Sequence, residues 1–426
     1  MKKICLTVVG LFILLFHAFS QSNYKKERIN NGFDTTIATQ YESSTLHLEQ
    51  VDLVSSYYKQ DGNHSSVTGG VGTEKVTDLS NGLELKFLAK SSTGKKITLV
   101  TGLGIDHHTA ASSAWVNKTG ASKTSGTRVY PSLSLQSENQ KGNSWSAGMY
   151  FSGEYNYKSF GIDAGLTHKV GTGGELSVKG SAYLDKVTMI LPSELIPQPT
   201  YVGPTVTTTA SGRRVSTSGY YLSDDEDIPT SPRNTFTGTL SYAQVINKKL
   251  QVSGTMDLVA QDGFLSLPFH RVYDNAGTVH QEKLPDQRFK IPLGFRANYF
   301  LNDLIILRTF YRYYQDNWGV KAHTVSLEVP VKLSPFFSIS PFVRAYSQTA
   351  SKYFAPYKVH KATDEFYTSN YAYAKLNSLY FGGGIHLSPP NGIFGTALSA
   401  VDIRYAQYKQ STDLNSNIIS VALQWK

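Results

Sequence analysis

The stretch that decides the expected fold is LIILRTFYRYYQDNWGVKAHTVSLEVPVKL, residues 304–333. In its first half, apolar and tyrosine side chains fall at odd positions, whereas Arg308 and Arg312 fall at even ones. In its second half, the odd positions from 325 to 333 carry only Val and Leu, opposite Glu328 and Lys332. Successive side chains alternate across a β-strand. The stretch therefore predicts a hairpin with one apolar and one charged face, turning at the polar segment 316–319.

The predicted strands exceed the usual length of about 5–6 residues. They match the ~9–11 residues that a tilted strand needs to cross a bilayer. Alternation alone also fits a pair of soluble β-sandwiches. Strand length, tyrosines at the strand ends and repetition of the pattern along the chain favour a membrane-spanning barrel instead.

The N-terminus, MKKICLTVVGLFILLFHAFSQ, has a basic start, an apolar run and small residues before Gln21. This pattern predicts a cleaved secretory signal peptide over residues 1–20, with a short membrane anchor as the alternative. Cys5, the chain's only cysteine, lies within it, so the mature chain can form no disulfide. Residues 21–45 are polar and predict a periplasmic lead-in. The barrel is expected over residues 46–426.

Strand and turn signals alternate through residues 46–426. They predict an all-β fold, a transmembrane antiparallel β-barrel of about 16 strands, with short periplasmic turns and long extracellular loops. The longest loop is expected near 191–233, another at 262–287, and late strands at 371–386 and 416–426. A composition of 27 Tyr, 21 Phe and 35 Gly but only 4 Met fits such a barrel. The aromatic last strand predicts recognition by the barrel-assembly machinery.

The formal charge is +9. This charge would attract outer-membrane lipid headgroups or small anionic solutes. No basic run with interleaved aromatics appears, so nucleic acid is not an expected partner, and no cofactor is expected.

Inward-facing charges could set the ion preference of a pore. The alternation places a cluster of mainly basic side chains inside the C-terminal half of the barrel. Single acidic side chains on other strands also face inward: Asp52, Glu84, Asp185 and Asp257. The alternative is that these groups pair with one another and fill a closed barrel. The lumen candidates are Lys290, Arg296, Arg308, Arg312, Glu328, Arg344, Asp402 and Arg404.

A second set of polar residues lies at the expected outer ends of strands. Histidines and aspartates from several loops could meet there and coordinate a metal, but no pair has a recognised ligand spacing, so no metal site is predicted. The alternative is that the aspartates cap turns. These mouth candidates are Asp61, His64, His107, His108, His270, Asp286 and Asp316.

An enzyme is not predicted. Some outer-membrane barrels are lipid hydrolases that use Ser and His. Ser55 with His64, or Ser266 with His270, could be imagined, but no nucleophile motif such as G-x-S-x-G is present.

Several motifs resemble those of a secreted bacterial family classified as a domain of unknown function. They are YYKQDGNHSSVTGGVGTEKVTD at 57–78, LPFHRVYDN at 267–275, LPDQRFKIPLGFR at 284–296, the segment 310–342, and the YFAPY and FYTSNYAYAKLNS segments at 353–378. The resemblance spans nearly the whole mature chain. It implies an outer-membrane barrel but does not imply any particular activity or catalytic residue.

Together these features predict an outer-membrane, porin-like channel for small solutes, with anions preferred. The alternative is a closed barrel that acts as an extracellular binding or assembly scaffold through its loops. Whether loop 191–233 plugs the lumen, which solute passes and how many copies assemble are questions that the sequence leaves open.

Overall fold

The computed structural model describes residues 44–109, 125–195 and 228–426, together with the backbone of four short strands between residues 201 and 221. The chain divides into two units, residues 1–40 and 41–426, and every described residue belongs to the second. The predicted signal peptide, and nearly all of the predicted lead-in, lie outside the described residues. No helix in the described part of the chain is long and apolar enough to cross a membrane.

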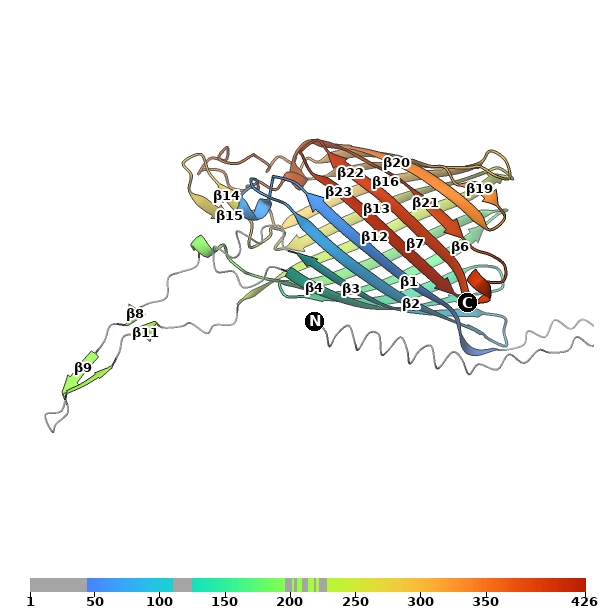
Figure 1. The fold of residues 1–426 in the computed structure, drawn as a ribbon, viewed down its shortest axis with the longest axis horizontal. Helices are drawn as coiled ribbons and strands as arrows, with labels where there is room; N and C mark the ends of the chain where they lie inside the picture. The colour runs from blue at the N-terminus through green and yellow to red at the C-terminus, as the bar shows by residue number, and fades with distance from the viewer. Residues whose placement is uncertain are drawn as a thin grey trace, which may run out of the picture. The chain divides into compact units, whose positions relative to one another are not determined.

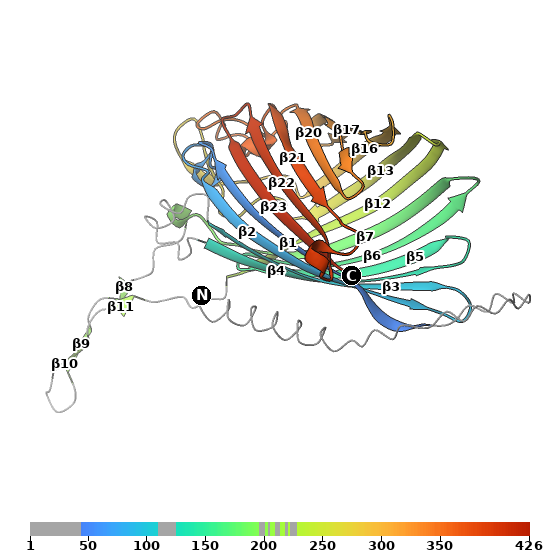
Figure 2. The ribbon, with the colours of Figure 1, turned by 45° about the vertical axis from the view of Figure 1, so that its right-hand side comes forward.

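Long antiparallel strands dominate the fold, and Figures 1 and 2 show them tilted and side by side. They are β1 (Ser44–Asp61), β2 (Val76–Lys90), β3 (Lys96–Thr109), β4 (Ser125–Glu138), β5 (Ser144–Glu154), β6 (Tyr157–Val170), β7 (Gly174–Thr188), β12 (Thr230–Asn247), β13 (Leu250–Gly263), β16 (Gln287–Phe300), β17 (Ile306–Asp316), β18 (Lys321–Glu328), β19 (Val331–Ser334), β20 (Phe337–Gln348), β21 (Leu376–Leu387), β22 (Leu398–Gln410) and β23 (Asn415–Trp425).

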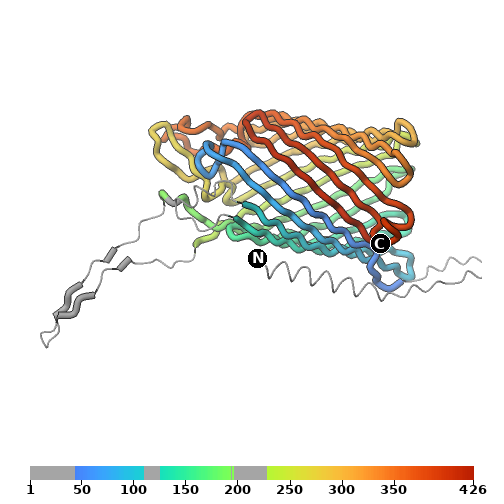
Figure 3. The backbone as a smooth tube through the Cα atoms, in the orientation of Figure 1, coloured from blue at the N-terminus to red at the C-terminus, as the bar shows by residue number. Residues whose placement is uncertain are grey.

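These segments form one closed sheet. Each strand pairs with its neighbour in the chain, and β1 pairs with β23, so that the blue and red strands lie side by side in Figure 3. Both β18 and β19 pair with β20, on either side of Val329 and Pro330. They are therefore one strand interrupted where proline offers no amide hydrogen. The predicted barrel of 16 antiparallel strands is confirmed.

The outer face of the barrel is apolar. On β6, for example, the outward side chains of Phe160, Ile162 and Leu166 are exposed, Leu166 to 67%. Asp163 of the same strand points inward and is 9% exposed. Apolar side chains repeated around a closed sheet are stabilised only when a nonpolar phase covers them. The molecule is therefore a transmembrane β-barrel.

Short connections lie at the end of the barrel where β1 begins and β23 finishes, here called the turn end. Three of them are organised by an asparagine side chain whose Oδ1 accepts two backbone amide hydrogens. These residues are Asn139, Asn247 and Asn302. Asparagine favours such turns because its side chain replaces a backbone acceptor.

The opposite end, here called the loop end, carries connections 62–75, 110–124, 155–156, 189–229, 264–286, 317–320, 349–375 and 411–414. They contain the short hairpin β14 (Arg271–Tyr273) and β15 (Val279–Gln281). The segment 62–75 adds the 3₁₀ turn η1 (Ser66–Thr68), and a second 3₁₀ turn is η2 (Ser193–Leu195). The connection 189–229 also includes β8 (Tyr201–Val202), β9 (Thr205–Thr208), β10 (Arg214–Thr217) and β11 (Tyr220–Tyr221).

Three local expectations were wrong. Residues 262–287 are not a plain loop, since they contain β14 and β15. The strand expected at 371–386 begins only at Leu376, because 371–373 form the 3₁₀ turn η3 (Tyr371–Tyr373), capped by the Asn370 side chain. The strand expected to run unbroken to Leu333 is interrupted at Pro330. A further 3₁₀ turn, η4 (Ile393–Gly395), precedes β22.

Candidate functional site: a cationic lumenal cavity beneath a loop cap

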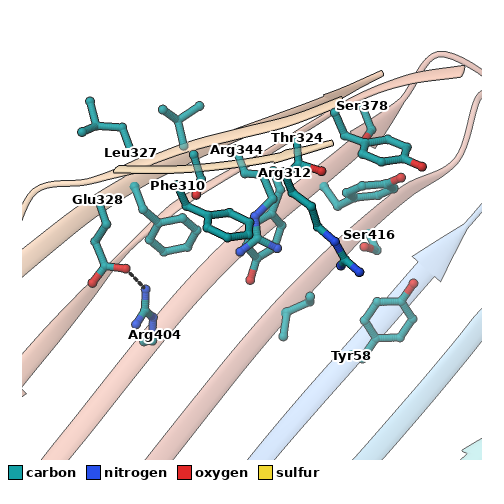
Figure 4. A pocket seen from close by; sticks show the side chains of 17 residues that line it. Tyr58, Phe310, Arg312, Thr324, Leu327, Glu328, Arg344, Ser378, Arg404 and Ser416 are labelled. Carbon is teal, nitrogen blue, oxygen red and sulfur yellow. Dashed lines mark hydrogen bonds and ion pairs between the residues drawn. The ribbon is translucent and has the colours of Figure 1, made fainter. Parts of the chain in front are cut away.

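A cavity of 830 Å³ lies against the inner wall formed by β1, β17, β18 and β20–β23. Figure 4 shows arginine, aromatic and hydroxyl side chains directed into it. Its lining comprises Tyr58, Phe310, Arg312, Thr324, Ser326, Leu327, Glu328, Phe342, Val343, Arg344, Tyr346, Ser378, Tyr380, Arg404, Tyr408, Ser416 and Ile418.

Strand register explains why these side chains meet. Arg312 pairs with Thr324, Ser326 with Arg344, Arg344 with Tyr380, and Gly384 with Arg404. Paired residues on neighbouring antiparallel strands point to the same face of a sheet. Even-numbered positions on all these strands therefore face inward together, and residues nearly a hundred positions apart contribute to one surface.

Among the described residues that line the cavity, Glu328 is the only carboxylate, and two arginines contact it. Its Oε1 lies 3.4 Å from Nη1 of Arg308. Its Oε2 lies 3.1 Å from Nη2 of Arg404, as Figure 4 shows. The Arg404 guanidinium also lies 4.9 Å from the centroid of the Phe342 ring. One negative charge thus meets two positive ones, which leaves this part of the wall net positive.

Two further arginines are unpaired. Within the described part of the chain, Arg312 and Arg344 form no ion pair or hydrogen bond. The Arg344 guanidinium lies 5.7 Å from the centroid of the Tyr380 ring. Guanidinium groups cannot deprotonate in proteins, so both charges are permanent. Their hydrogen-bond donors are free to engage an anion in the cavity.

Tyrosines line the same cavity toward the loop end. The hydroxyl groups of Tyr58, Tyr346 and Tyr408 donate to the glutamine two residues further along each strand. The distances are 2.5 Å to Gln60, 2.6 Å to Gln348 and 2.6 Å to Gln410. Residues i and i+2 lie on one face of a strand. The repeated Tyr-x-Gln spacing is visible in the sequence. It could have indicated that these tyrosines line the cavity, but it was not recognised.

The remaining lumen candidates lie outside this cavity. The Arg296 guanidinium lies 5.6 Å from the Phe310 ring centroid, and Lys290 pairs in register with Asp316. Asp402 lies 2.9 Å from His386. The scattered acids have other partners. Asp52 accepts from Gln424, Asp185 from Tyr157, and Asp257 from Thr239, whereas Glu84 pairs in register with Asp52.

Above the strands, the connections 62–75, 264–286, 317–320 and 349–375 pack into one structure, here called the loop cap. Its apolar centre contains Leu265, Leu284 and Trp318, with Tyr353 and Tyr373 packed around them. Trp318 is only 1% exposed. The turn expected at 316–319 is present, but Trp318 within it is buried, and its Nε1 donates to the Gln287 carbonyl at 3.0 Å.

Charged contacts join the loop cap across the sequence. Arg271 forms an ion pair with Glu194 at 2.8 Å and donates to the Val67 carbonyl at 2.7 Å. Asp316 accepts from Arg288, from Tyr314 and from the amides of Trp318 and Val320. These contacts link strand ends to four separate connections. The sequence indicated Asp316 as a candidate and placed Arg271 and Arg288 in polar clusters at the mouth, but gave no sign of Glu194.

The mouth candidates divide between the loop cap and the strand ends. His64 stacks on Tyr371 with ring centroids 3.8 Å apart, and His270 is buried beside Glu282. His107 faces outward and meets Thr127 at 2.9 Å, whereas His108 faces inward and meets Glu154 at 3.1 Å. Asp61 lies 3.9 Å from Lys75, and the side chain of Asp286 is exposed. Across the described residues, no three histidines and acids gather to hold a metal.

Glu282 is a buried carboxylate of the loop cap. Burial raises the pKa of Glu282, but the neighbouring His270 and hydrogen bonds from His270, Thr368 and the Leu267 amide outweigh that effect. The pKa of Glu282 is therefore held below its usual range. The buried carboxylate is ionised at neutral pH, with its charge compensated by hydrogen bonds.

The chain is similar in fold to several outer-membrane barrels of known structure. OccK5 (OpdH) of Pseudomonas aeruginosa is 9% identical, with a TM-score of 0.40, over 88% of this chain and 97% of its own. A bacterial polysaccharide outer membrane secretin is 7% identical, with a TM-score of 0.44, over 88% and 98%. A mutant of the monoaromatic hydrocarbon channel TodX is 9% identical, with a TM-score of 0.39, over 88% and 89%.

No curated protein sequence matches the chain. A family model does, and its description is "Protein of unknown function (DUF3570)". The match covers residues 34–421, which include the whole barrel except the last residues of β23. The chain therefore belongs to the DUF3570 family.

Proposed function

We propose that this protein is an outer-membrane channel whose lumen binds and conducts small anionic solutes. The observation that carries the proposal is the pair Arg312 and Arg344, which face an 830 Å³ cavity inside the barrel without a partner among the described residues. Rings of charged side chains set the ion preference of pores.

The physical basis is the difference between paired and unpaired charge. Glu328 already compensates part of the charge of Arg308 and Arg404, so an entering anion gains little from these two groups. Arg312 and Arg344 keep their full attraction. The Tyr380 ring, whose centroid lies 5.7 Å from the Arg344 guanidinium, helps to hold that group in place, since cations are attracted to ring faces. The cavity therefore favours an anion that fits between arginine and aromatic surfaces.

The location follows from the barrel itself. Closed barrels with an apolar outer band and an even number of strands reside in bacterial outer membranes. The predicted signal peptide at residues 1–20 would provide export. Outer-membrane lipids are then the partners of the apolar face. The aromatic final strand β23 would be the segment that the barrel-assembly machinery recognises.

Planar-bilayer recording of the purified full chain tests the proposal. We expect discrete channel openings, and under a salt gradient a reversal potential that shows anion preference. A barrel that inserts, as shown by heat-modifiable migration in gels, but passes no current would overturn the channel proposal.

A second candidate function is a binding or assembly scaffold, and the ordered loop cap favours it. A surface fixed by Trp318 and by the Arg271–Glu194 ion pair is preorganised, which lowers the entropic cost of binding a partner. Removing residues 196–227 distinguishes the two candidates. Loss of the cellular phenotype with unchanged conductance would favour the scaffold, and altered conductance would favour the channel.

A further inference from the structure

Three residues from two connections of the loop cap form a continuous hydrogen-bond chain. The Oγ atom of Ser66 lies 3.0 Å from Nε2 of His270, and Nδ1 of His270 lies 3.5 Å from Oε1 of Glu282. In the neutral tautomer whose proton is on Nδ1, His270 donates to the Glu282 carboxylate. His270 Nε2 is then an acceptor, and the Ser66 hydroxyl donates to it.

The fold fixes each member of this chain. His270 immediately precedes β14 and Glu282 immediately follows β15, so the pairing of Arg271 with Gln281 brings them together. The amide of Glu282 donates to the carbonyl of His270 at 3.0 Å, which fixes the backbone at this point. Ser66 arrives from the connection between β1 and β2, at the first position of η1.

Two further hydrogen bonds orient the Glu282 carboxylate. The Thr368 hydroxyl donates to Oε1, and the Leu267 amide donates to Oε2 at 2.8 Å. His270 and Glu282 are both buried, at 5% and 4% exposure, whereas Ser66 is half-buried and reaches the surface. A buried acid, an imidazole oriented by it and an accessible hydroxyl are the parts of a nucleophilic triad, which is recognised by geometry and not by sequence position.

We propose that Ser66, His270 and Glu282 form an esterase site at the mouth of the barrel, an activity beyond solute passage and independent of it. In the first step, Ser66 Oγ attacks the carbonyl carbon of a carboxylic ester while its proton passes to His270 Nε2. The C–O bond to the alcohol then breaks, and His270 returns the proton to the leaving oxygen. Water next attacks the acyl-serine through the same groups, releasing the acid and restoring Ser66.

A fixed backbone carbonyl and an aromatic ring lie beside the nucleophile. The Val67 carbonyl is fixed by Arg271. Phe269, whose ring lies 5.2 Å from that of His270, adds an apolar surface, which favours an ester with an apolar acyl group.

Labelling with a fluorophosphonate probe tests the site in the purified full chain, followed by peptide mass spectrometry. We expect the adduct on Ser66 and none in Ser66→Ala. Glu282→Gln should slow labelling by about 10²-fold, a typical contribution of general-base catalysis. Ser92→Ala, which alters an exposed serine in the turn between β2 and β3, should label at the wild-type rate.

Hydrolysis of p-nitrophenyl butyrate provides the second measurement. We expect turnover by wild-type protein and by Ser92→Ala, and background rates for Ser66→Ala. Absence of an adduct on Ser66 in the folded wild-type protein would overturn the proposal. Equal labelling rates for wild-type protein and Glu282→Gln would overturn it as well. Neither result depends on conductance, so failure here leaves the channel proposal intact.

Discussion

The guanidinium carbon of Arg288 lies 4.4 Å from the centroid of the Trp318 ring, at the point where β16 meets the loop cap. The same guanidinium donates to Oδ2 of Asp316. Oδ1 of Asp316 accepts hydrogen bonds from the amides of Trp318 and Val320. One arginine therefore joins a strand end, a turn and the apolar centre of the cap. The cap is anchored to the barrel wall through this contact.

Trp318→Ala is expected to loosen the loop cap. Removing a buried Trp side chain costs about 3–5 kcal/mol, and here the loss falls on loops, while the barrel hydrogen bonds persist. Hydrogen exchange of peptides from 264–286 and 349–375 should accelerate by several orders of magnitude. Trp145→Ala, at a 44% exposed outward position on β5, should leave exchange in the cap unchanged. Equal protection in both variants would contradict the role of Trp318.

Arg312→Ala and Arg344→Ala are each expected to reduce anion preference. The expected decrease in the anion-to-cation permeability ratio is roughly fivefold, because about 1 kcal/mol of charge attraction is lost in a water-filled pore. Reversal potentials under a salt gradient measure the ratio. Arg308→Ala is the comparison variant and should have a smaller effect, since Glu328 compensates part of its charge. A larger effect at Arg308 than at the other two positions would show that pairing does not govern selectivity.

Glu328→Gln is expected to act in the opposite direction. It releases the guanidinium groups of Arg308 and Arg404, so the wall becomes more positive and anion preference increases. The same reversal-potential measurement applies. Glu49→Gln, which removes an exposed carboxylate near the start of β1, should leave the ratio unchanged. A decrease in anion preference for Glu328→Gln would exclude the electrostatic explanation.

The loop cap is expected to loosen in acid. The pKa of Glu282 is lowered in the folded state, so its contribution to stability is complete above its ordinary pKa of about 4.3. That contribution is lost as the pH falls through the lower, folded-state value. Hydrogen exchange of residues 264–286, corrected for its intrinsic pH dependence, should therefore increase only below about pH 4.

Two variants check this assignment. Glu282→Gln should exchange faster than wild-type protein already at pH 7, with little further change in acid. Glu365→Gln, which alters an exposed carboxylate in the same cap, should retain the wild-type pH profile. A wild-type profile in Glu282→Gln would assign the acid transition to another group.

The barrel could be predicted because one property repeats on every strand. A strand between lipid and lumen must alternate apolar and polar side chains, as residues 304–316 do, and a one-residue slip would reverse every side chain. Parity therefore placed Arg312 and Arg344 on the inner face. It could not indicate which arginines are paired, since Glu328 meets Arg404 from 76 positions away in the chain.

The loop cap could not be predicted for a related reason. The contact between Ser66 and His270 joins residues 204 positions apart, with no periodicity in the loops to indicate it. Local hydrogen bonds also replaced an expected strand, where Asn370 caps the turn at 371–373. Short polar side chains compete with strand pairing in this way.

The pairing of β1 with β23 has a consequence for biogenesis. Gln424 donates to Asp52 at 3.1 Å across 372 positions of sequence, so the first strand obtains its second neighbour only after the entire chain has been exported. Until then, β1 keeps an open edge that could pair with another molecule. Such late, long-range closure makes folding slow. A chain truncated before residue 415 would keep two open edges permanently and should be cleared by proteolysis or accumulate as aggregate.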